Sequence, residues 1–201
     1  MADISFNFNE FIEDSKNTLI KPKDYFSAIP KTGGFVDPII KACIYSLAAG
    51  IIYFIWALLK IGGSWGMHGQ AMVGFGSIMV IFTTLIGGVV GLFIGGLILM
   101  LISMICSGDT NYETNVRVTA SLMVLTPVNA LLSFITGINL YLGIIISLLI
   151  GLYGIWLLYT ALINSLSAKE KVAKIVCIVL AILLAFFTLI SLFTPKAPMP
   201  M

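Results

Sequence analysis

The sequence predicts an all-α protein, a polytopic membrane bundle of five transmembrane helices that follows a cytoplasmic amphipathic helix. Composition is the first reason. Hydrophobic residues make up 59% of the 201 residues and charged residues only 10%, whereas soluble domains contain about 25% charged residues. The 19 glycines agree, since membrane helices tolerate glycine better than soluble helices do. The formal net charge of +2 is too small to suggest a nucleic acid as partner.

Residues 1–38 are expected to form a cytoplasmic arm. They contain no apolar run, so no cleavable signal peptide is expected. Their hydrophobic residues recur at the spacing of one helix face, and lysines follow just before the first span, as in helices that lie in the membrane interface. Docking onto the bundle itself or onto a partner is the alternative. The candidate lipid or partner contacts of the arm are Phe8, Phe11, Ile12, Lys21 and Lys23.

Five apolar stretches within residues 39–193 are long enough to be transmembrane helices. A helix needs about 20 apolar residues to cross about 30 Å of hydrocarbon. The tail, residues 194–201, contains three prolines and is expected to be disordered. The predicted spans cover residues 39–59, 80–105, 116–136, 140–163 and 173–193.

The count of five and the orientation follow from the positive-inside rule. Residues 61–79 are glycine-rich and hold His68, so we interpret them as a loop or an interfacial stretch rather than a sixth span. With the N-terminus inside, all Lys and Arg residues except Lys60 and Lys196 face the cytoplasm. A sixth span would move the basic cluster at residues 169–174 outside. The C-terminus is therefore predicted outside, and a prokaryotic plasma membrane is the expected location.

Small residues recur every fourth position in several spans. Lipid gives helices no hydrophobic reason to associate, so close approach through small residues matters. One interpretation is packing within a single bundle, and the other is a homodimer face, for which the glycines of the second span are the main candidates. The candidate packing or dimer residues are Gly87, Gly91, Gly95, Gly143, Ser147 and Gly151.

Pro127 interrupts the third predicted span. Proline lacks an N–H group, so the carbonyl of Met123 loses its helical donor. Thr126, Asn129 and Ser133 are close enough in sequence to satisfy the freed backbone group. The proline therefore predicts either a structural kink or a hinge that lines a polar cavity.

The sequence offers no recognisable catalytic or metal-binding constellation. His68 is the single histidine, which excludes a multi-histidine metal site, and no phosphate-binding glycine loop occurs. The three cysteines form no C-x-x-C pair and are interpreted as small apolar residues. Neither an enzyme, a cofactor nor a metal is predicted. Arg117, at the cytoplasmic start of the third span, is expected to pair with Asp109 or Glu113, or else to contact lipid phosphate or a partner.

Three segments together resemble the Yip-domain family of Ypt/Rab-interacting-type integral membrane proteins, in its prokaryotic branch. The family's N-terminal signature is similar to residues 11–26, FIEDSKNTLIKPKDYF, in which a short helix ends at a proline and an aromatic pair follows. Its glycine-containing inner loop is similar to SGDTNYE at residues 107–113, and its third span to RVTAS at residues 117–121 with Pro127 beyond.

This resemblance implies a five-span bundle and no settled activity. Eukaryotic members are Golgi and endoplasmic reticulum proteins that associate with Rab-type GTPases through longer cytoplasmic arms with an Asp-Leu-Tyr-Gly-Pro motif. That motif is missing from this sequence, so the resemblance does not predict Rab binding here. The expected partners are the lipid bilayer, a second copy, or another membrane protein.

We derive one main functional hypothesis and two alternatives from the sequence. The main hypothesis is a non-enzymatic membrane scaffold, adaptor or membrane organiser, because small-residue stripes and an amphipathic arm accompany the absence of catalytic motifs. The first alternative is a channel or carrier for a neutral solute or lipid, which would use the kinked third helix. The second is a membrane enzyme that acts on lipid.

Overall fold

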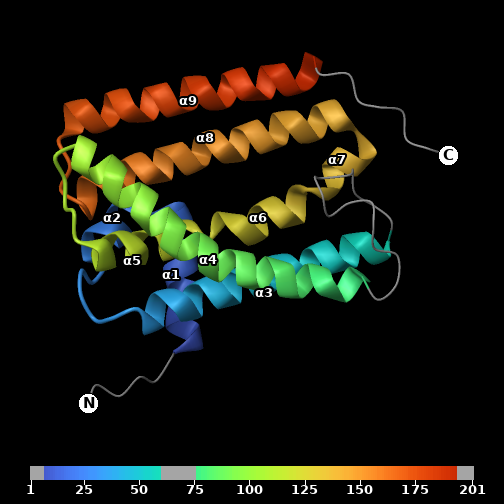
Figure 1. Ribbon diagram of the computed structural model, residues 1–201, viewed down its shortest axis with the longest axis horizontal. Coiled ribbons are helices and arrows are strands. Elements are labelled where there is room, and N and C mark those ends of the chain that lie inside the picture. Colours follow the sequence, from blue (N-terminus) through green and yellow to red (C-terminus); the bar gives the residue numbers. More distant parts are fainter. Residues whose placement is uncertain (1–6, 60–75, 194–201) are drawn as a thin grey trace.

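The computed structural model describes residues 7–59 and 76–193, and all regular secondary structure in these two ranges is α-helical (Figure 1). Within these two ranges, five helical segments are long and apolar enough to cross a membrane, which confirms the predicted fold class and the five predicted spans. The predicted loop around His68 and the predicted disordered tail lie outside the described residues. The spanning segments are α3 (Val36–Leu58), α4 (Gly76–Ile105), the interrupted third segment (Tyr112–Ile138), α8 (Leu140–Asn164) and α9 (Glu170–Phe193).

Helix α4 is longer than predicted and runs obliquely across the bundle (Figure 1). Residues 76–79, predicted as part of the preceding loop, belong to its first turn. Its 30 residues correspond to about 45 Å of helix, and a stretch longer than the hydrocarbon thickness is accommodated by tilting. Helix α4 packs against α3 and α5, and Leu99 near its end and Cys106 just beyond it join a buried cluster that also contains residues of α8 and α9.

The third segment consists of three helices: α5 (Tyr112–Leu122), α6 (Leu125–Leu132) and α7 (Phe134–Ile138). The interruption before α6 lies one turn ahead of Pro127. The backbone N–H of Thr126 donates to the Met123 carbonyl at 2.9 Å, so the carbonyl that proline leaves without a donor is satisfied locally. The Ser133 hydroxyl donates to the Ala130 carbonyl at 2.7 Å, while Asn129 is exposed.

Helix α4 meets its neighbours through glycines adjacent to the predicted ones. A Cβ on Gly88 would overlap the Ser46 hydroxyl of α3, and one on Gly96 would lie 2.5 Å from Val116 Cγ2 of α5. Gly87 and Gly91 are instead exposed, with no heavy atom within 4 Å of such a Cβ. The third predicted glycine, Gly95, does lie at a contact within the bundle, since a Cβ on it would lie 2.9 Å from Thr119 Cγ2 of α5. Intramolecular packing therefore uses Gly88 and Gly96 with Gly95 beside them, and a dimer contact at the exposed Gly87 and Gly91 stays a prediction.

In α8 the predicted small residues lie at contacts with neighbouring helices. A Cβ on Gly143 would lie 2.5 Å from the Thr136 Cα of α7, so the α7–α8 crossing needs glycine there. A Cβ on Gly151 would meet the flexible Leu184 side chain of α9 at 2.7 Å. Ser147 between them is partly buried.

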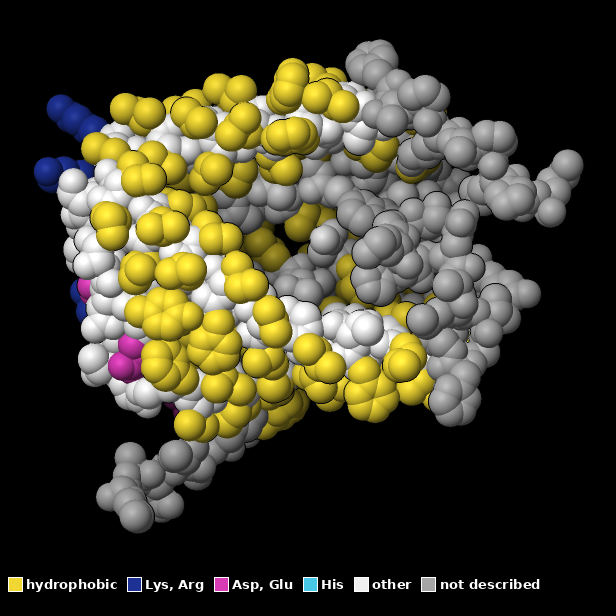
Figure 2. Space-filling model, in the orientation of Figure 1, with side chains coloured by type: hydrophobic (Ala, Val, Ile, Leu, Met, Phe, Trp, Pro, Cys, Tyr) yellow, Lys and Arg dark blue, Asp and Glu magenta, His cyan; other side chains and the backbone are white. Residues whose placement is uncertain are grey.

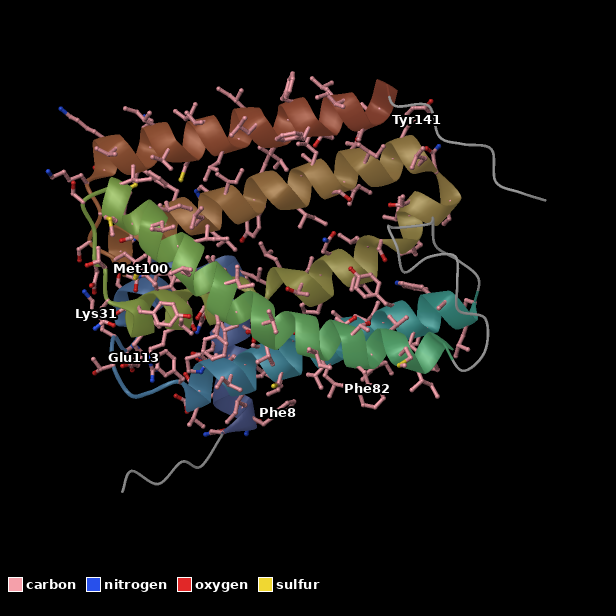
Figure 3. All side chains as sticks on the ribbon, in the orientation of Figure 1. Phe8, Lys31, Phe82, Met100, Glu113 and Tyr141 are labelled. Atoms are coloured by element: carbon pink, nitrogen blue, oxygen red, sulfur yellow. The ribbon has the colours of Figure 1, made fainter. Side chains whose placement is uncertain are left out.

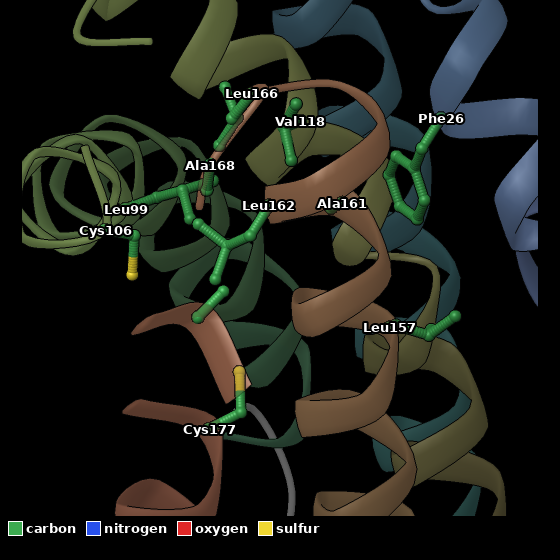
Figure 4. Packing of buried hydrophobic residues seen from close by; sticks show 11 residues of the cluster. Phe26, Leu99, Cys106, Val118, Leu157, Ala161, Leu162, Leu166, Ala168 and Cys177 are labelled. Carbon is green, nitrogen blue, oxygen red and sulfur yellow. The ribbon is translucent and has the colours of Figure 1, made fainter. Parts of the chain in front are cut away.

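The largest buried cluster lies at the end where α2, α4, α8 and α9 converge (Figure 4). Phe26 of α2 and Leu157 and Leu162 of α8 are fully buried there. Elsewhere the spans expose large apolar side chains, as expected of a surface that faces lipid. Lys, Arg, Asp and Glu side chains gather at the same end as the cluster, which we call the charged end (Figure 2).

Candidate interaction site at the charged end

The arm forms two short helices, α1 (Phe8–Ile20) and α2 (Pro22–Ala28). Asn7 caps α1, because its side-chain oxygen accepts hydrogen bonds from the N–H groups of Asn9 and Glu10 at 3.0 and 3.4 Å. Pro22 begins α2 at the first helical position, where its missing N–H costs nothing. The predicted amphipathic arm helix therefore exists, and a second helix follows it.

Helix α1 packs on the bundle through one face. The Phe11 ring lies 5.1 Å from the Tyr45 ring of α3, centroid to centroid, and both pack against Val124. The hydroxyls of Ser15 and Tyr45 share a hydrogen bond at 2.7 Å. At the other end of α1, the Tyr153 hydroxyl of α8 donates to the Leu19 carbonyl. The arm is thus docked on its own bundle from α3 across to α8.

Lys41 is the first of two buried cations beneath the arm. Its side chain is only 11% exposed, and its ammonium group donates to Asp14 of α1 at 2.8 Å and to the Tyr25 hydroxyl of α2 at 3.4 Å. Asp37, one turn earlier in α3, lies 3.9 Å away. Burying a charge is costly unless it is paired and hydrogen-bonded, and here the pairing groups come from both arm helices. The charge of Lys41 therefore ties the arm to α3.

Arg117 is the second buried cation, with a side chain 7% exposed. Its Nε lies 3.3 Å from Glu113, which confirms one of the two predicted partners; Asp109 instead accepts from the Asn111 N–H at 2.9 Å. Its Nη2 donates to the Gly34 carbonyl at 2.8 Å, and Nη1 lies 3.6 Å from Asp37.

The Arg117–Glu113 pair holds the linker between α2 and α3. Glu113 accepts a hydrogen bond from the Gly34 N–H at 2.6 Å, and Arg117 donates one to the Gly34 carbonyl. The two side chains therefore bind both backbone polar groups of Gly34. Gly33 and Gly34 have φ of 134° and 83°, which favours glycine. A Cβ on Gly33 would also lie 2.7 Å from Arg117 Nη2. Figure 3 shows Glu113 and the linker residue Lys31 together at this end.

A cleft of about 500 Å³ lies between the arm, the linker and the starts of α3 and α5. Its lining carries both signs of charge, since it includes the cations Lys41 and Arg117 and carboxylates such as Glu10 and Asp37. Asp37 is half exposed and has no bond shorter than 3.6 Å to either cation. The cleft therefore offers charged groups that a ligand or partner can still reach.

The sequence predicted part of this site. Phe11 and Arg117 belong to it, whereas Phe8, Ile12, Lys21 and Lys23 are exposed around it. Pro127, Asn129 and Ser133 do not line the cleft. Sequence reasoning missed the acidic and hydroxyl groups that pair with the cations. The available signal was the charge of Lys41 inside an otherwise apolar span, since such charges generally have a partner. The missed residues are Asp14, Tyr25, Asp37, Lys41 and Tyr45.

Comparison with known proteins gives one match. The family model described as Yip1 domain matches residues 16–192, from the middle of α1 to the end of α9. No curated protein and no solved structure matches the chain significantly. The match thus includes the second half of α1, α2 and every spanning helix.

Proposed function

The chain belongs to the Yip1 domain family, and on this premise we propose that it is a non-enzymatic membrane scaffold or adaptor. The observation that carries the proposal is the docked arm. Asp14, Tyr25 and Gly34 are held by two buried cations of the bundle, so the arm forms a preorganised surface rather than a free tail. Preorganised surfaces bind with less loss of conformational entropy.

We propose that this surface faces the cytoplasm, in a prokaryotic plasma membrane. Support comes from the lysines of the linker, of the loop between α8 and α9 and of the start of α9, because short cytoplasmic loops and the adjoining ends of spans carry an excess of Lys and Arg. Residues 11–26, similar to the prokaryotic signature, lie within this surface. The lysines concerned are Lys31, Lys169, Lys171 and Lys174.

The partner, on this proposal, is another membrane-associated protein that binds the exposed side of α2 and the linker. Lys23, Asp24 and Ser27 are exposed on α2, and the neighbouring cleft provides carboxylates of both the arm and α3. A surface with mixed charge favours a complementary polar partner and gives specificity and orientation more than raw affinity.

A photocrosslinking amino acid at position 24 tests the proposal in living cells. We expect one discrete protein adduct from position 24 and only lipid adducts from position 149, because Leu149 is exposed on the apolar side of α8. The adduct at 24 should weaken when Lys41→Met loosens the arm. Lipid adducts alone at positions 23, 24 and 27 would contradict a scaffold that acts through this surface.

A further inference from the structure

The depth of α1 along the spans can be derived from its contacts. Tyr45 lies one turn beyond Lys41 in α3, and Val124 lies seven residues beyond Arg117. With a rise of about 1.5 Å per residue, the Phe11 end of α1 therefore lies about 6–10 Å beyond the last charged residues of these two spans. An in-plane amphipathic helix buries its apolar face about 5–10 Å into the boundary between headgroups and acyl chains. The contacts thus place the Phe11 end of α1, which also carries Phe8 and Ile12, at this boundary.

The direction of α1 also fits a helix in the membrane plane. Phe11 and Ser15 contact α3, while the Leu19 carbonyl contacts Tyr153 of α8. Figure 1 shows α1 crossing the direction in which the spans run. Its 13 residues correspond to about 20 Å, which is enough to reach across the bundle from α3 to α8.

The rotation of α1 about its axis follows from two anchors. Asp14 points to Lys41, whereas Phe11 and Ser15 point to Tyr45, one turn farther from the charged end. Successive residues of a helix are rotated by about 100° about its axis. Rotation from Asp14 past Phe11 and Ser15 leads on to Phe8 and Ile12, which lie at about 120° and 160° from Asp14.

Phe8 and Ile12 therefore point away from the charged end, toward the hydrocarbon. Their side chains are 58% and 49% exposed, and Figure 3 shows Phe8 at the periphery of the molecule. Glu10 lies on the opposite side of the helix and lines the charged cleft, which agrees independently with this rotation. Ile20, 66% exposed, lies on the face turned away from the bundle.

We propose that α1 is an in-plane wedge in the leaflet at the charged end, with Phe8 and Ile12 in contact with lipid acyl chains. The lipid surface of the spans is continuous with it, since Leu47 and Ile51 are exposed on α3 beyond Tyr45. The wedge widens the protein in that leaflet. The protein therefore favours membranes that are convex on the charged side.

This inference rests on the proposed role as a membrane scaffold and names the lipid of one leaflet as a further partner. Its first test is nitroxide accessibility in the full-length protein in lipid nanodiscs, with the labels at positions 8, 12 and 20 in turn and with Cys43, Cys106 and Cys177 replaced by serine. Labels at 8 and 12 should collide more often with dissolved oxygen, which concentrates in hydrocarbon, than with a water-soluble nickel complex. The label at 20 should collide more often with the nickel complex. Water-exposed labels at 8 and 12 would overturn the wedge.

The second test measures curvature preference on membrane tubes pulled from giant vesicles in which protease treatment shows the arm outside. The wild type should be enriched on the tube relative to the vesicle. The double variant Phe8→Ser/Ile12→Ser should lose this enrichment, and the matched control Ile20→Ser should keep it. Equal enrichment of all three proteins would refute the wedge. Protein adducts at position 24 do not depend on lipid shape, so the two proposals fail separately.

Discussion

The variant Gly96→Leu is expected to lower the free energy of unfolding by about 3 kcal/mol, the upper part of the range for overpacked sites. A Cβ there would lie 2.5 Å from Val116 Cγ2 and 3.1 Å from Val116 Cα. Since the second atom is backbone, rotation of the Val116 side chain cannot remove the clash, and α4 and α5 must separate. Unfolding of the protein in mixed micelles of increasing denaturing detergent measures the loss.

The matched control for this variant is Gly91→Leu. It makes the same change on the same helix, but at an exposed position with no heavy atom within 4 Å of the added Cβ. Its effect should stay within about 0.5 kcal/mol, as for surface substitutions. Equal losses for the two variants would mean that α4 does not use the Gly88 and Gly96 face within the bundle.

The second large effect is a loss of arm docking in the variant Lys41→Met. Methionine keeps the apolar stem but removes the charge that pairs with Asp14 and Tyr25. Removing one partner of a fully buried ion pair costs about 3–5 kcal/mol of stability. Because Asp14 is partly exposed, we expect the free energy of docking of the arm to fall by about 2 kcal/mol. Because 1.4 kcal/mol is a factor of ten, the undocked population of the arm should rise about thirtyfold. Tryptic cleavage after Lys23 follows this population when opening is fast.

Lys171→Met serves as the control, since Lys171 is exposed at the start of α9. It removes the same charge and should leave cleavage of the arm unchanged. In the double variant Asp14→Asn/Lys41→Met, the second substitution should add little, because the pair is already broken. Additive effects of the two substitutions would show that Asp14 and Lys41 do not act together.

The spans were predictable because hydrophobicity over about 20 residues is a local property of the sequence. The interruption of the third segment near Pro127 follows from the same kind of local chemistry, a missing donor. The start of α4 was predicted too late, since the glycines before residue 80 argue for a loop while neighbouring helices can still stabilise a first turn there. Tertiary packing often overrides helix propensity in this way.

The packing face of α4 was not predictable, for a geometric reason. Glycines at 87, 91 and 95 repeat every four residues, and Gly88 and Gly96 lie on the same period one residue later. Periodicity identifies both stripes, but only the neighbours decide which glycines are used: Ser46 at Gly88, Val116 at Gly96 and Thr119 at Gly95.

The ion network depends on pairs far apart in sequence. Asp14 with Lys41 and Glu113 with Gly34 meet only after the arm has docked. The sequence did indicate that the arm helix was amphipathic, but its pattern fits the membrane interface and the bundle equally. The structure shows that one face of α1 packs on Tyr45, while an adjacent face stays exposed, and contact of that face with lipid is the proposal made above.

Hydrogen exchange of the wild-type protein in nanodiscs tests most directly whether the arm is docked. An isolated helix of 13 residues is marginal in water, so slow exchange of α1 requires contacts with the bundle or with lipid, and faster exchange in Lys41→Met identifies the contacts with the bundle. We predict that amides from Phe11 to Ile20 exchange as slowly as those at the start of α5 and that Lys41→Met accelerates them. Exchange of α1 in the wild type at the rate of an unstructured peptide would contradict the docked arm and the proposals built on it.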